Sequence, residues 1–317
     1  MKVVLTDYRY DSISSFIEVF KRRGVDFEIF QCESKKELLN ATEFADGVIT
    51  HFSNIDNEVI ANMKNCKAVI RSGIGLEVID IPSATAKRIA VMNVPRYCVQ
   101  DVSDHVLMFM LALNKRLRVL DNSVHQGKWD YNIAKPITRL SEKTLGLVGF
   151  GAIAREVAKK VLVFGMNVVA YDPYISQEEV SLPVKMCSFD ELLFCSDVIS
   201  IHIPLTGETK GLFDESVFFK MKKHPIVINT ARGSLIKEAD LINALKSGIV
   251  SGVGLDVLEE EKICTSNKLL SFDNVLITPH SAWYSEQSIQ TLQSSAAEEI
   301  CNYLEGKPAI GVANKFL

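Results

Sequence analysis

The sequence predicts an α/β protein of two domains, each built on a parallel sheet with helices on its faces. The chain has 317 residues, which is more than one small core needs and suits two domains of ordinary size. Short apolar runs alternate with helical patterns from the first residue onward, and such alternation implies crossover connections between parallel strands. The content of 47% hydrophobic and 23% charged residues is typical of a folded globular chain.

The first series of elements predicts one α/β domain of roughly a hundred residues. Strands are expected at residues 3–5, 27–30, 47–50, 68–70 and 90–92. Between the first two strands, apolar residues recur at helical spacing, at Ile13, Phe16, Ile17 and Phe20. This domain is therefore expected to begin with a strand, a helix and a second strand.

The second series predicts another α/β domain in the middle of the chain. After Pro95, residues 102–120 predict one long helix that bridges the two domains. Six strands are then expected at residues 144–148, 168–171, 198–201, 226–229, 253–255 and 275–277. Residues 285–304 predict a last helix that ends before Gly306-Lys307-Pro308 and packs back on the first domain.

A phosphate-binding turn is expected after the strand at residues 144–148, where GxGxxA runs from Gly149 to Ala154 and a helix follows. Gly149 permits the tight turn, and Gly151 lets the backbone approach a pyrophosphate at the positive end of the helix. Asp172 ends the next strand, where a carboxylate can bind the ribose hydroxyls and repel a 2′-phosphate. The pattern predicts a Rossmann-like domain that prefers NAD to NADP, although Asp172 could also be a turn residue before Pro173.

Charge and composition exclude several other classes of protein. The net charge is −4 and the basic residues are spread along the chain, so direct binding to nucleic acid is not expected. The longest apolar run, residues 106–113, is far shorter than the roughly twenty residues that span a bilayer, and no signal segment is evident, so a cytoplasmic location is expected. The seven cysteines lack a CxxC pair and are expected to be mostly buried free thiols, and no metal site is expected.

Three candidate catalytic residues follow apolar strands of the second series. Arg232 follows the strand at 226–229, Glu261 follows the strand at 253–255, and His280 follows the strand at 275–277. Open α/β sheets bind ligands at the carboxyl ends of their strands, so the three side chains could meet at one cleft. Each residue also has a plain alternative, as a solvated loop arginine, a surface acid and a helix-capping or core histidine.

These segments and the phosphate loop resemble the D-isomer-specific 2-hydroxyacid dehydrogenase family, which includes phosphoglycerate and glycerate/hydroxypyruvate dehydrogenases. The resemblance covers nearly the whole chain, with further matching stretches at residues 75–80, 102–105, 127–129 and 202–206. Within the family, residues 171–174, 280–287 and 312–315 look closest to the C-terminal-binding-protein branch, which includes NAD(H)-linked transcriptional corepressors.

The resemblance implies that the protein reduces a small 2-keto acid to the D-2-hydroxy acid with NADH. His280 would give a proton to the carbonyl oxygen, because imidazole exchanges protons near neutral pH. Glu261 would hydrogen-bond the other ring nitrogen and favour the charged ring. Arg232 would bind the substrate carboxylate with its planar fork of donors and polarise the keto oxygen.

The resemblance also implies the remaining contacts and the division of the chain. The expected substrate contacts are the backbone N–H groups of Ile74 and Gly75, together with Arg232 and the Trp283 side chain. The expected cofactor contacts are Gly149, Phe150, Gly151, Ala152, Ile153, Asp172, His202, Pro204, Thr209, Thr230, Ala231, Arg232, Asp256 and His280. Residues 1–97 and 286–317 would form a discontinuous substrate domain, and residues 98–285 an inserted NAD-binding domain that carries a homodimer contact, with the helix at 102–120 as a candidate.

Some positions and readings stay open. Lys262 stands where the family usually has proline after its catalytic glutamate, so Glu259 or Glu260 could take the role given to Glu261, and Glu77 replaces a usual aspartate. One alternative is an NAD(H)-sensing, corepressor-like binding protein with little or no turnover. An L-specific lactate or malate dehydrogenase is disfavoured, because its phosphate loop lies near the N-terminus rather than at Gly149.

Overall fold

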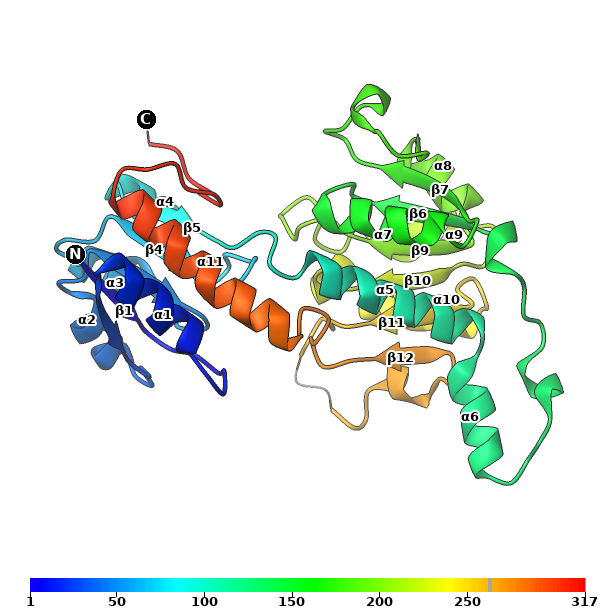
Figure 1. Cartoon of the computed structure of the whole chain (residues 1–317). Helices are drawn as coiled ribbons and strands as arrows, with labels where there is room; N and C mark the ends of the chain where they lie inside the picture. Colours follow the sequence, from blue (N-terminus) through cyan, green and yellow to red (C-terminus); the bar gives the residue numbers. More distant parts are fainter. Residues whose placement is uncertain (262–263, 317) are drawn as a thin grey trace. The chain divides into compact units, whose positions relative to one another are not determined.

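The computed structural model describes residues 1–261 and 264–316, and the chain divides into two compact units (Figure 1). Unit 1 contains Met1–Cys98 and Tyr284–Leu317, and unit 2 contains Val99–Trp283. Both units have an α/β architecture, as predicted. The position of Lys262, where the sequence departs from the family pattern, lies outside the described residues.

Unit 1 has a five-stranded parallel sheet in the order β2-β1-β3-β4-β5. Its strands are β1 (Lys2–Leu5), β2 (Asp26–Ile29), β3 (Gly47–Thr50), β4 (Ala68–Arg71) and β5 (Ala90–Met92), so all five predicted strands are confirmed. Its helices are α1 (Ser14–Arg23), α2 (Lys35–Thr42), α3 (Asn57–Asn62), α4 (Ile81–Ala86) and α11 (Glu286–Leu304).

Helix α11 packs against α1 and β4, which confirms that the end of the chain returns to the first sheet. Arg23 on α1 ties the two helices together, because its guanidinium contacts Glu298 at 3.1 Å and Glu305 at 3.1 Å. Gly47 makes the close approach possible, since a Cβ there would lie 2.9 Å from the side chains of Ile300 and Leu304.

Unit 2 has a seven-stranded parallel sheet in the order β12-β11-β10-β9-β6-β7-β8. Its strands are β6 (Thr144–Val148), β7 (Asn167–Tyr171), β8 (Lys185–Met186), β9 (Val198–Ile201), β10 (Ile226–Asn229), β11 (Gly252–Leu255) and β12 (Val275–Ile277). The six predicted strands are confirmed, and the short strand β8 was not predicted. The strand order reverses between β6 and β9, which is where open α/β sheets bind ligands.

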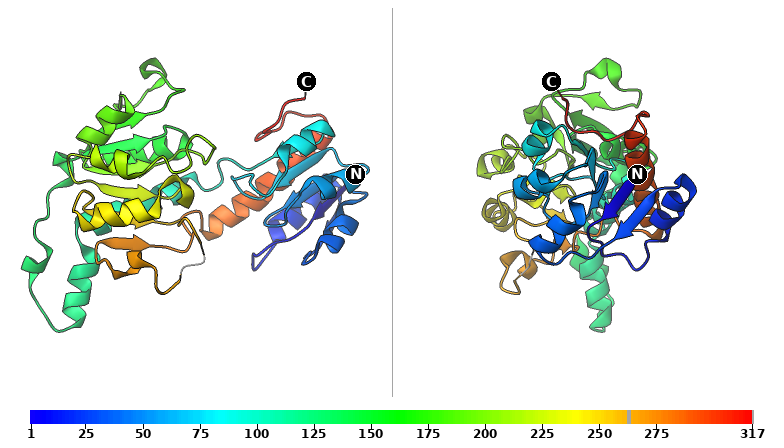
Figure 2. Two further views of the ribbon diagram at one scale, coloured as in Figure 1. Left: turned by 180° about the vertical axis from the view of Figure 1, so that it is seen from behind. Right: turned by 90° about the vertical axis from the view of Figure 1, so that its left-hand side faces the viewer.

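Helices cover both faces of this sheet (Figure 2). They are α5 (Val99–Asn114), α7 (Ala152–Leu162), α8 (Phe189–Cys195), α9 (Glu215–Phe219) and α10 (Glu238–Lys246). Apolar side chains of α5 and α7 form one buried cluster, and those of α8, α9 and α10 form another. Burial on both sides explains why the strands are continuous apolar runs.

The single helix predicted at residues 102–120 is wrong in two respects. The helix ends at Asn114, Arg116 adopts a left-handed φ of 50°, and a separate helix α6 (Leu117–His125) follows. Both helices belong to unit 2, so neither is a bridge between domains. Helix α6 and the short helix η1 (Tyr131–Ala134) extend away from the sheet of unit 2 as an arm (Figure 1).

The cysteine prediction is half right. All seven cysteines are free thiols, but only Cys98 and Cys301 are buried; four are half-buried and Cys264 is exposed. Within residues 1–261 and 264–316, no helix is both long enough and apolar enough to cross a membrane.

Candidate active site

The phosphate loop has the geometry that a dinucleotide needs. Gly149 has a φ of 88°, and a Cβ there would lie 2.8 Å from the carbonyl oxygen of His202, so only glycine fits where β6 and β9 diverge. The first helical bond of α7 runs from Arg155 N to Gly151 O at 3.0 Å, so the preceding amides lie at the open end of the helix. Apart from the adjoining backbone of residues 150–152 and of α7, no heavy atom of the described chain lies within 4 Å of a Cβ built on Gly151, and this leaves room for a pyrophosphate.

Asp172 lies at the end of β7 and holds the phosphate loop in place. Its Oδ2 accepts a hydrogen bond from Phe150 N at 2.9 Å, and its Oδ1 accepts one from Tyr174 N at 3.0 Å. The second bond corresponds to the turn role that the sequence left open. Because each carboxylate oxygen can accept more than one hydrogen bond, binding of a ribose by Asp172 stays a prediction.

The other predicted cofactor residues lie on the loops after β9 and β10. His202 Nε2 lies 2.9 Å from Ser200 Oγ, and burial lowers the pKa of this imidazole to about 4. Thr209 Oγ1 donates to Pro204 O at 2.7 Å and closes the loop after β9. Thr230 Oγ1 is buried and has no hydrogen-bond partner among the described residues. Buried polar atoms are normally satisfied, so this hydroxyl is suited to a ligand.

Arg232 is held by a turn that depends on a buried asparagine. Asn229 Oδ1 accepts a hydrogen bond from Ala231 N at 3.0 Å, and Asn229 Nδ2 donates to Arg232 O at 2.9 Å. A Cβ on Gly233 would lie 1.8 Å from Leu258 O, so this turn packs directly on the loop that leads to Glu261. Sequence reasoning assigned no role to Asn229, although a polar residue at the end of an apolar strand was a usable signal.

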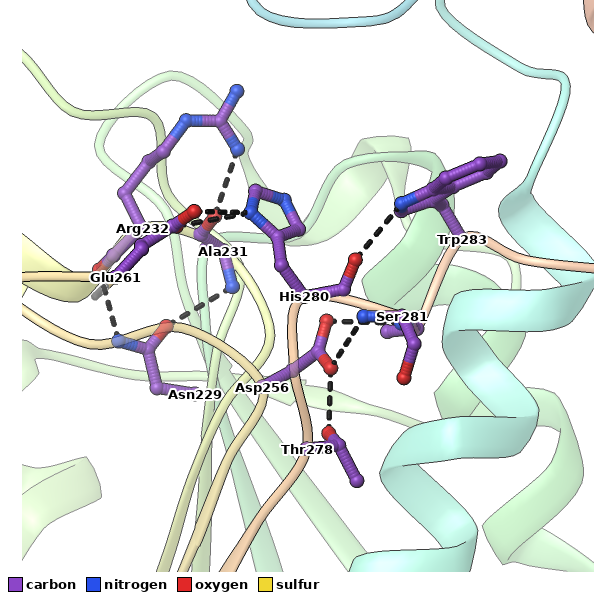
Figure 3. Close-up of polar contacts among 10 residues, drawn as sticks. Asn229, Ala231, Arg232, Asp256, Glu261, Thr278, His280, Ser281 and Trp283 are labelled. Atoms are coloured by element: carbon purple, nitrogen blue, oxygen red, sulfur yellow. Dashed lines mark hydrogen bonds and ion pairs between the residues drawn. The ribbon is translucent and has the colours of Figure 1, made fainter. Parts of the chain in front are cut away.

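The side chains of His280 and Glu261 contact each other at the carboxyl end of the sheet (Figure 3). His280 Nδ1 lies 2.9 Å from Glu261 Oε1 and 3.0 Å from Oε2. The His280 side chain is 42% exposed and that of Glu261 is 53% exposed, so both can reach a ligand. Glu259 Oε2 instead accepts a hydrogen bond from Glu238 N at 3.3 Å, at the start of α10.

Asp256 supports the turn that carries His280. Its Oδ1 accepts hydrogen bonds from Thr278 Oγ1 at 2.5 Å and Ser281 N at 2.9 Å, and its Oδ2 accepts one from Ala282 N at 2.9 Å. This support was missed, because the sequence suggested only a cofactor contact for Asp256. The Trp283 indole also stabilises the turn, because its Nε1 donates a hydrogen bond to His280 O at 2.9 Å. The predicted role of Trp283 as a wall of the substrate pocket stays a prediction.

Ile74 and Gly75 lie in unit 1, on the loop after β4. Asn93 Nδ2 donates to Ile74 O at 2.6 Å, and Arg71 Nη1 donates to Gly75 O at 3.0 Å. These contacts fix the carbonyl groups of the loop, and binding of a carboxylate by its amides stays a prediction. Among the residues that the structure describes, no group of three His, Cys, Asp or Glu side chains could hold a metal ion.

The strand order and the phosphate loop of unit 2 define a dinucleotide-binding domain of the Rossmann type. The family model described as "D-isomer specific 2-hydroxyacid dehydrogenase, NAD binding domain" matches residues 107–282, which is more than half of the chain. The chain therefore belongs to the D-isomer-specific 2-hydroxyacid dehydrogenase family, as the sequence predicted, and its central domain is the NAD-binding domain.

Known relatives support this membership over most of the chain. D-3-phosphoglycerate dehydrogenase of Archaeoglobus fulgidus is 37% identical, covering 94% of this chain and 57% of that protein. Hydroxypyruvate reductase of Thermotoga maritima is 40% identical, covering 74% of this chain and 76% of that protein. A solved structure of an acyclic imino acid reductase in complex with NADPH and D-Arg is 30% identical, with a TM-score of 0.89 over 99% of this chain and 100% of that one.

The chain spans only part of the phosphoglycerate dehydrogenases that it matches, between 52% and 59% of their length. Membership of the family sets aside the L-specific alternative. The finer resemblance to the C-terminal-binding-protein branch stays a prediction.

Proposed function

We propose that the protein is an NAD-dependent D-2-hydroxyacid dehydrogenase that reduces a small 2-keto acid with NADH. The observation that carries the proposal is the contact of His280 Nδ1 with both carboxylate oxygens of Glu261, at 2.9 and 3.0 Å. This pair and Arg232 lie together on unit 2 (Figure 3), which is the NAD-binding domain of the family. A histidine oriented by a carboxylate beside an arginine suits proton transfer to a keto acid.

The chemistry divides between the cofactor and three side chains. When NADH is bound, it supplies the hydride that forms the new bond to C2 of the keto acid. Because Nδ1 of His280 faces Glu261, the Nδ1 hydrogen goes to the carboxylate and Nε2 is the nitrogen that gives its proton to the carbonyl oxygen. Arg232 binds the substrate carboxylate and stabilises the charge that develops on that oxygen. The ring then recovers a proton from solvent, to which it is exposed.

The proposed cofactor contacts fit the observed geometry. The open N-terminus of α7 and the space beside Gly151 suit the pyrophosphate, and Asp172 suits the adenosine ribose. The Thr230 hydroxyl, which has no hydrogen-bond partner within residues 1–261 and 264–316, supports a ligand contact at the end of β10.

An assay of the purified chain with a panel of 2-keto acids tests the function. Hydroxypyruvate, pyruvate and 3-phosphohydroxypyruvate would be mixed with NADH or NADPH, and the loss of nicotinamide absorbance followed. We expect turnover of at least one acid, a D-configured product by chiral chromatography, and a preference for NADH because Asp172 repels a 2′-phosphate. Tight NADH binding without turnover of any acid would contradict the proposal and favour the NAD(H)-sensing alternative.

We also propose a homodimer formed through the arm of unit 2, residues 117–137. Its large side chains are exposed, with Trp129 at 91% and Tyr131 at 71%. A cavity of about 310 Å³ lies at the base of the arm, lined by residues such as Leu113, Val119 and Ile133. Exposed aromatic side chains next to a cavity in the same chain are suited to a self-complementary contact with a second copy.

The double substitution Trp129→Ser and Tyr131→Ser is expected to convert the dimer to a monomer at micromolar concentration, because it removes the two most exposed aromatic groups of the arm. Light scattering coupled to size-exclusion chromatography measures the mass. Tyr174→Ser, which removes an 87% exposed ring outside the arm, is the matched control and should leave the dimer intact. A wild-type monomer, or a dimer that survives the double substitution, would refute this contact.

A further inference from the structure

A chain of polar groups lies behind the His280 turn, and the proposed reaction does not use it. It runs from His105 on α5 through Thr278, directly after β12, to Asp256, directly after β11. His105 Nε2 lies 2.8 Å from Thr278 Oγ1, and Thr278 Oγ1 lies 2.5 Å from Asp256 Oδ1. Asp256 is 2% exposed, and its carboxylate accepts hydrogen bonds from protein groups.

The donors and acceptors of this chain can be arranged in one way only. A carboxylate accepts hydrogen bonds and donates none, so the single hydroxyl hydrogen of Thr278 goes to Asp256. Thr278 Oγ1 must then accept a hydrogen from His105 Nε2. Burial lowers the pKa of His105 below its ordinary 6.5, and this effect outweighs the nearby charge of Asp256, which raises the pKa. The ring is therefore neutral at pH 7, and Nε2 carries its one hydrogen. His105 therefore orients the Thr278 hydroxyl, and this hydroxyl in turn holds the Asp256 carboxylate in position.

Asp256 in turn holds the backbone at His280 and directly after it. Asp256 accepts hydrogen bonds from the amides of Ser281 and Ala282, each at 2.9 Å, and its carbonyl oxygen accepts one from His280 N at 2.8 Å. His280 has a φ of 53°, a left-handed conformation that is unfavourable for a non-glycine residue. Such a conformation persists where surrounding contacts impose it, and here those contacts converge on Asp256 (Figure 3).

We infer that His105 is a positioning residue: acting through Thr278 and Asp256, it holds the His280 turn in the conformation that directs the imidazole to Glu261. The inference rests on the proposed function for its effect on catalysis. His105 is itself fixed, because its ring packs edge-on against Phe109 with the centroids 4.8 Å apart. Nothing in the sequence pairs His105 with Thr278, which lies 173 residues further along the chain.

Substitutions that remove or restore one hydrogen bond test this role. His105→Phe keeps the ring on Phe109 but removes the Nε2 donor, whereas His105→Gln puts an amide donor near the same place. We expect His105→Phe to lower kcat about 10- to 100-fold, because a small misplacement of a catalytic group has effects of this size. KM and NADH affinity should change by less than about 3-fold, and His105→Gln should recover most of kcat.

Thr278→Val should reproduce the effect of His105→Phe, and the double variant should be no slower than either single variant, since the two residues act as one chain. Thr278→Ser, which keeps the hydroxyl, and Thr291→Val on the exposed surface of α11 are the matched controls. A His105→Phe variant that loses unfolding free energy but keeps the wild-type kcat would show a structural role only and overturn the inference.

Amide hydrogen exchange separates this inference from the proposed function. His105→Phe and Thr278→Val should speed exchange at Ser281 and Ala282, the two amides bound by Asp256, and leave the amides of β9 and β10 protected. If the wild-type protein reduces no keto acid, the proposed function is wrong. Faster amide exchange in the variants would still support the inference that His105 holds the His280 turn. Unchanged exchange at both amides would refute it.

Discussion

His280→Gln is expected to lower kcat for keto-acid reduction by about 10²- to 10⁴-fold, the range over which a positioned general acid acts. The substitution removes the group that can release a proton at neutral pH and keeps a side chain of similar size. Affinity for NADH, measured by fluorescence titration, should stay within about 3-fold of wild type, because the phosphate loop and Asp172 are untouched. A kcat within a few fold of wild type would remove His280 from the reaction.

A comparison of neighbouring glutamates identifies the partner of His280. Glu261→Gln leaves an oxygen that can accept the Nδ1 hydrogen but removes the negative charge, so kcat should fall by a smaller factor than in His280→Gln. Glu259→Gln is the matched control and should keep the wild-type kcat, because the Glu259 carboxylate bonds Glu238 N at the start of α10. Loss of activity in Glu259→Gln and not in Glu261→Gln would reverse the assignment.

The sheets could be predicted from the sequence because parallel strands buried on both faces are continuous apolar runs. Strand β8 has two residues and no such signal. The break between α5 and α6 was missed because Arg116 carries the turn in a left-handed conformation without the glycine that usually marks one. A local pattern of good helix formers therefore predicted one continuous helix.

The sequence predicted which candidate residues follow the strands, but it did not predict which side chains contact one another. Arg232, Glu261 and His280 follow adjacent strands, so the topology alone gathers them on one edge of the sheet. The family resemblance gave the role to Glu261 and left Glu259 and Glu260 open, because three consecutive acids give no distinguishing pattern; the contacts of Glu261 with His280 and of Glu259 with Glu238 N favour Glu261. The contacts of His105, Thr278 and Asp256 join α5 to the ends of two strands, and only the folded structure places these residues together.

The free energy of unfolding is expected to fall steeply as the pH is lowered from about 6.5 to about 4, because two imidazoles resist protonation in the folded state. Burial, assisted by the charge of Arg71, lowers the pKa of His51 to about 4, and burial lowers the pKa of His202 to about 4. Above the ordinary value of 6.5 both rings are neutral in the folded and unfolded chain, so they add no pH dependence there. Below it, the unfolded chain binds protons that the folded chain does not, and unfolding becomes easier.

Each histidine should contribute about 1.4 kcal/mol per pH unit, or roughly 3 kcal/mol over the interval, and the loss should level off below pH 4. Carboxylates affect the free energy of unfolding at lower pH. The hydrogen bond from Lys35 holds the pKa of Asp56 below its ordinary 3.8, so the stabilisation from this carboxylate is lost only as the pH falls below that value. Urea unfolding followed by circular dichroism at a series of pH values measures the slope.

The two histidines lie in different units, and this makes the assignment testable. His51→Gln should flatten the pH dependence of the transition of unit 1, and His202→Gln that of unit 2, because glutamine stays neutral throughout the interval. His125→Gln, which removes an exposed imidazole on α6, is the control and should leave both slopes unchanged. A wild-type free energy of unfolding that is flat between pH 6.5 and pH 5 would show that both rings accept protons in the folded protein, and their burial would then carry no electrostatic cost.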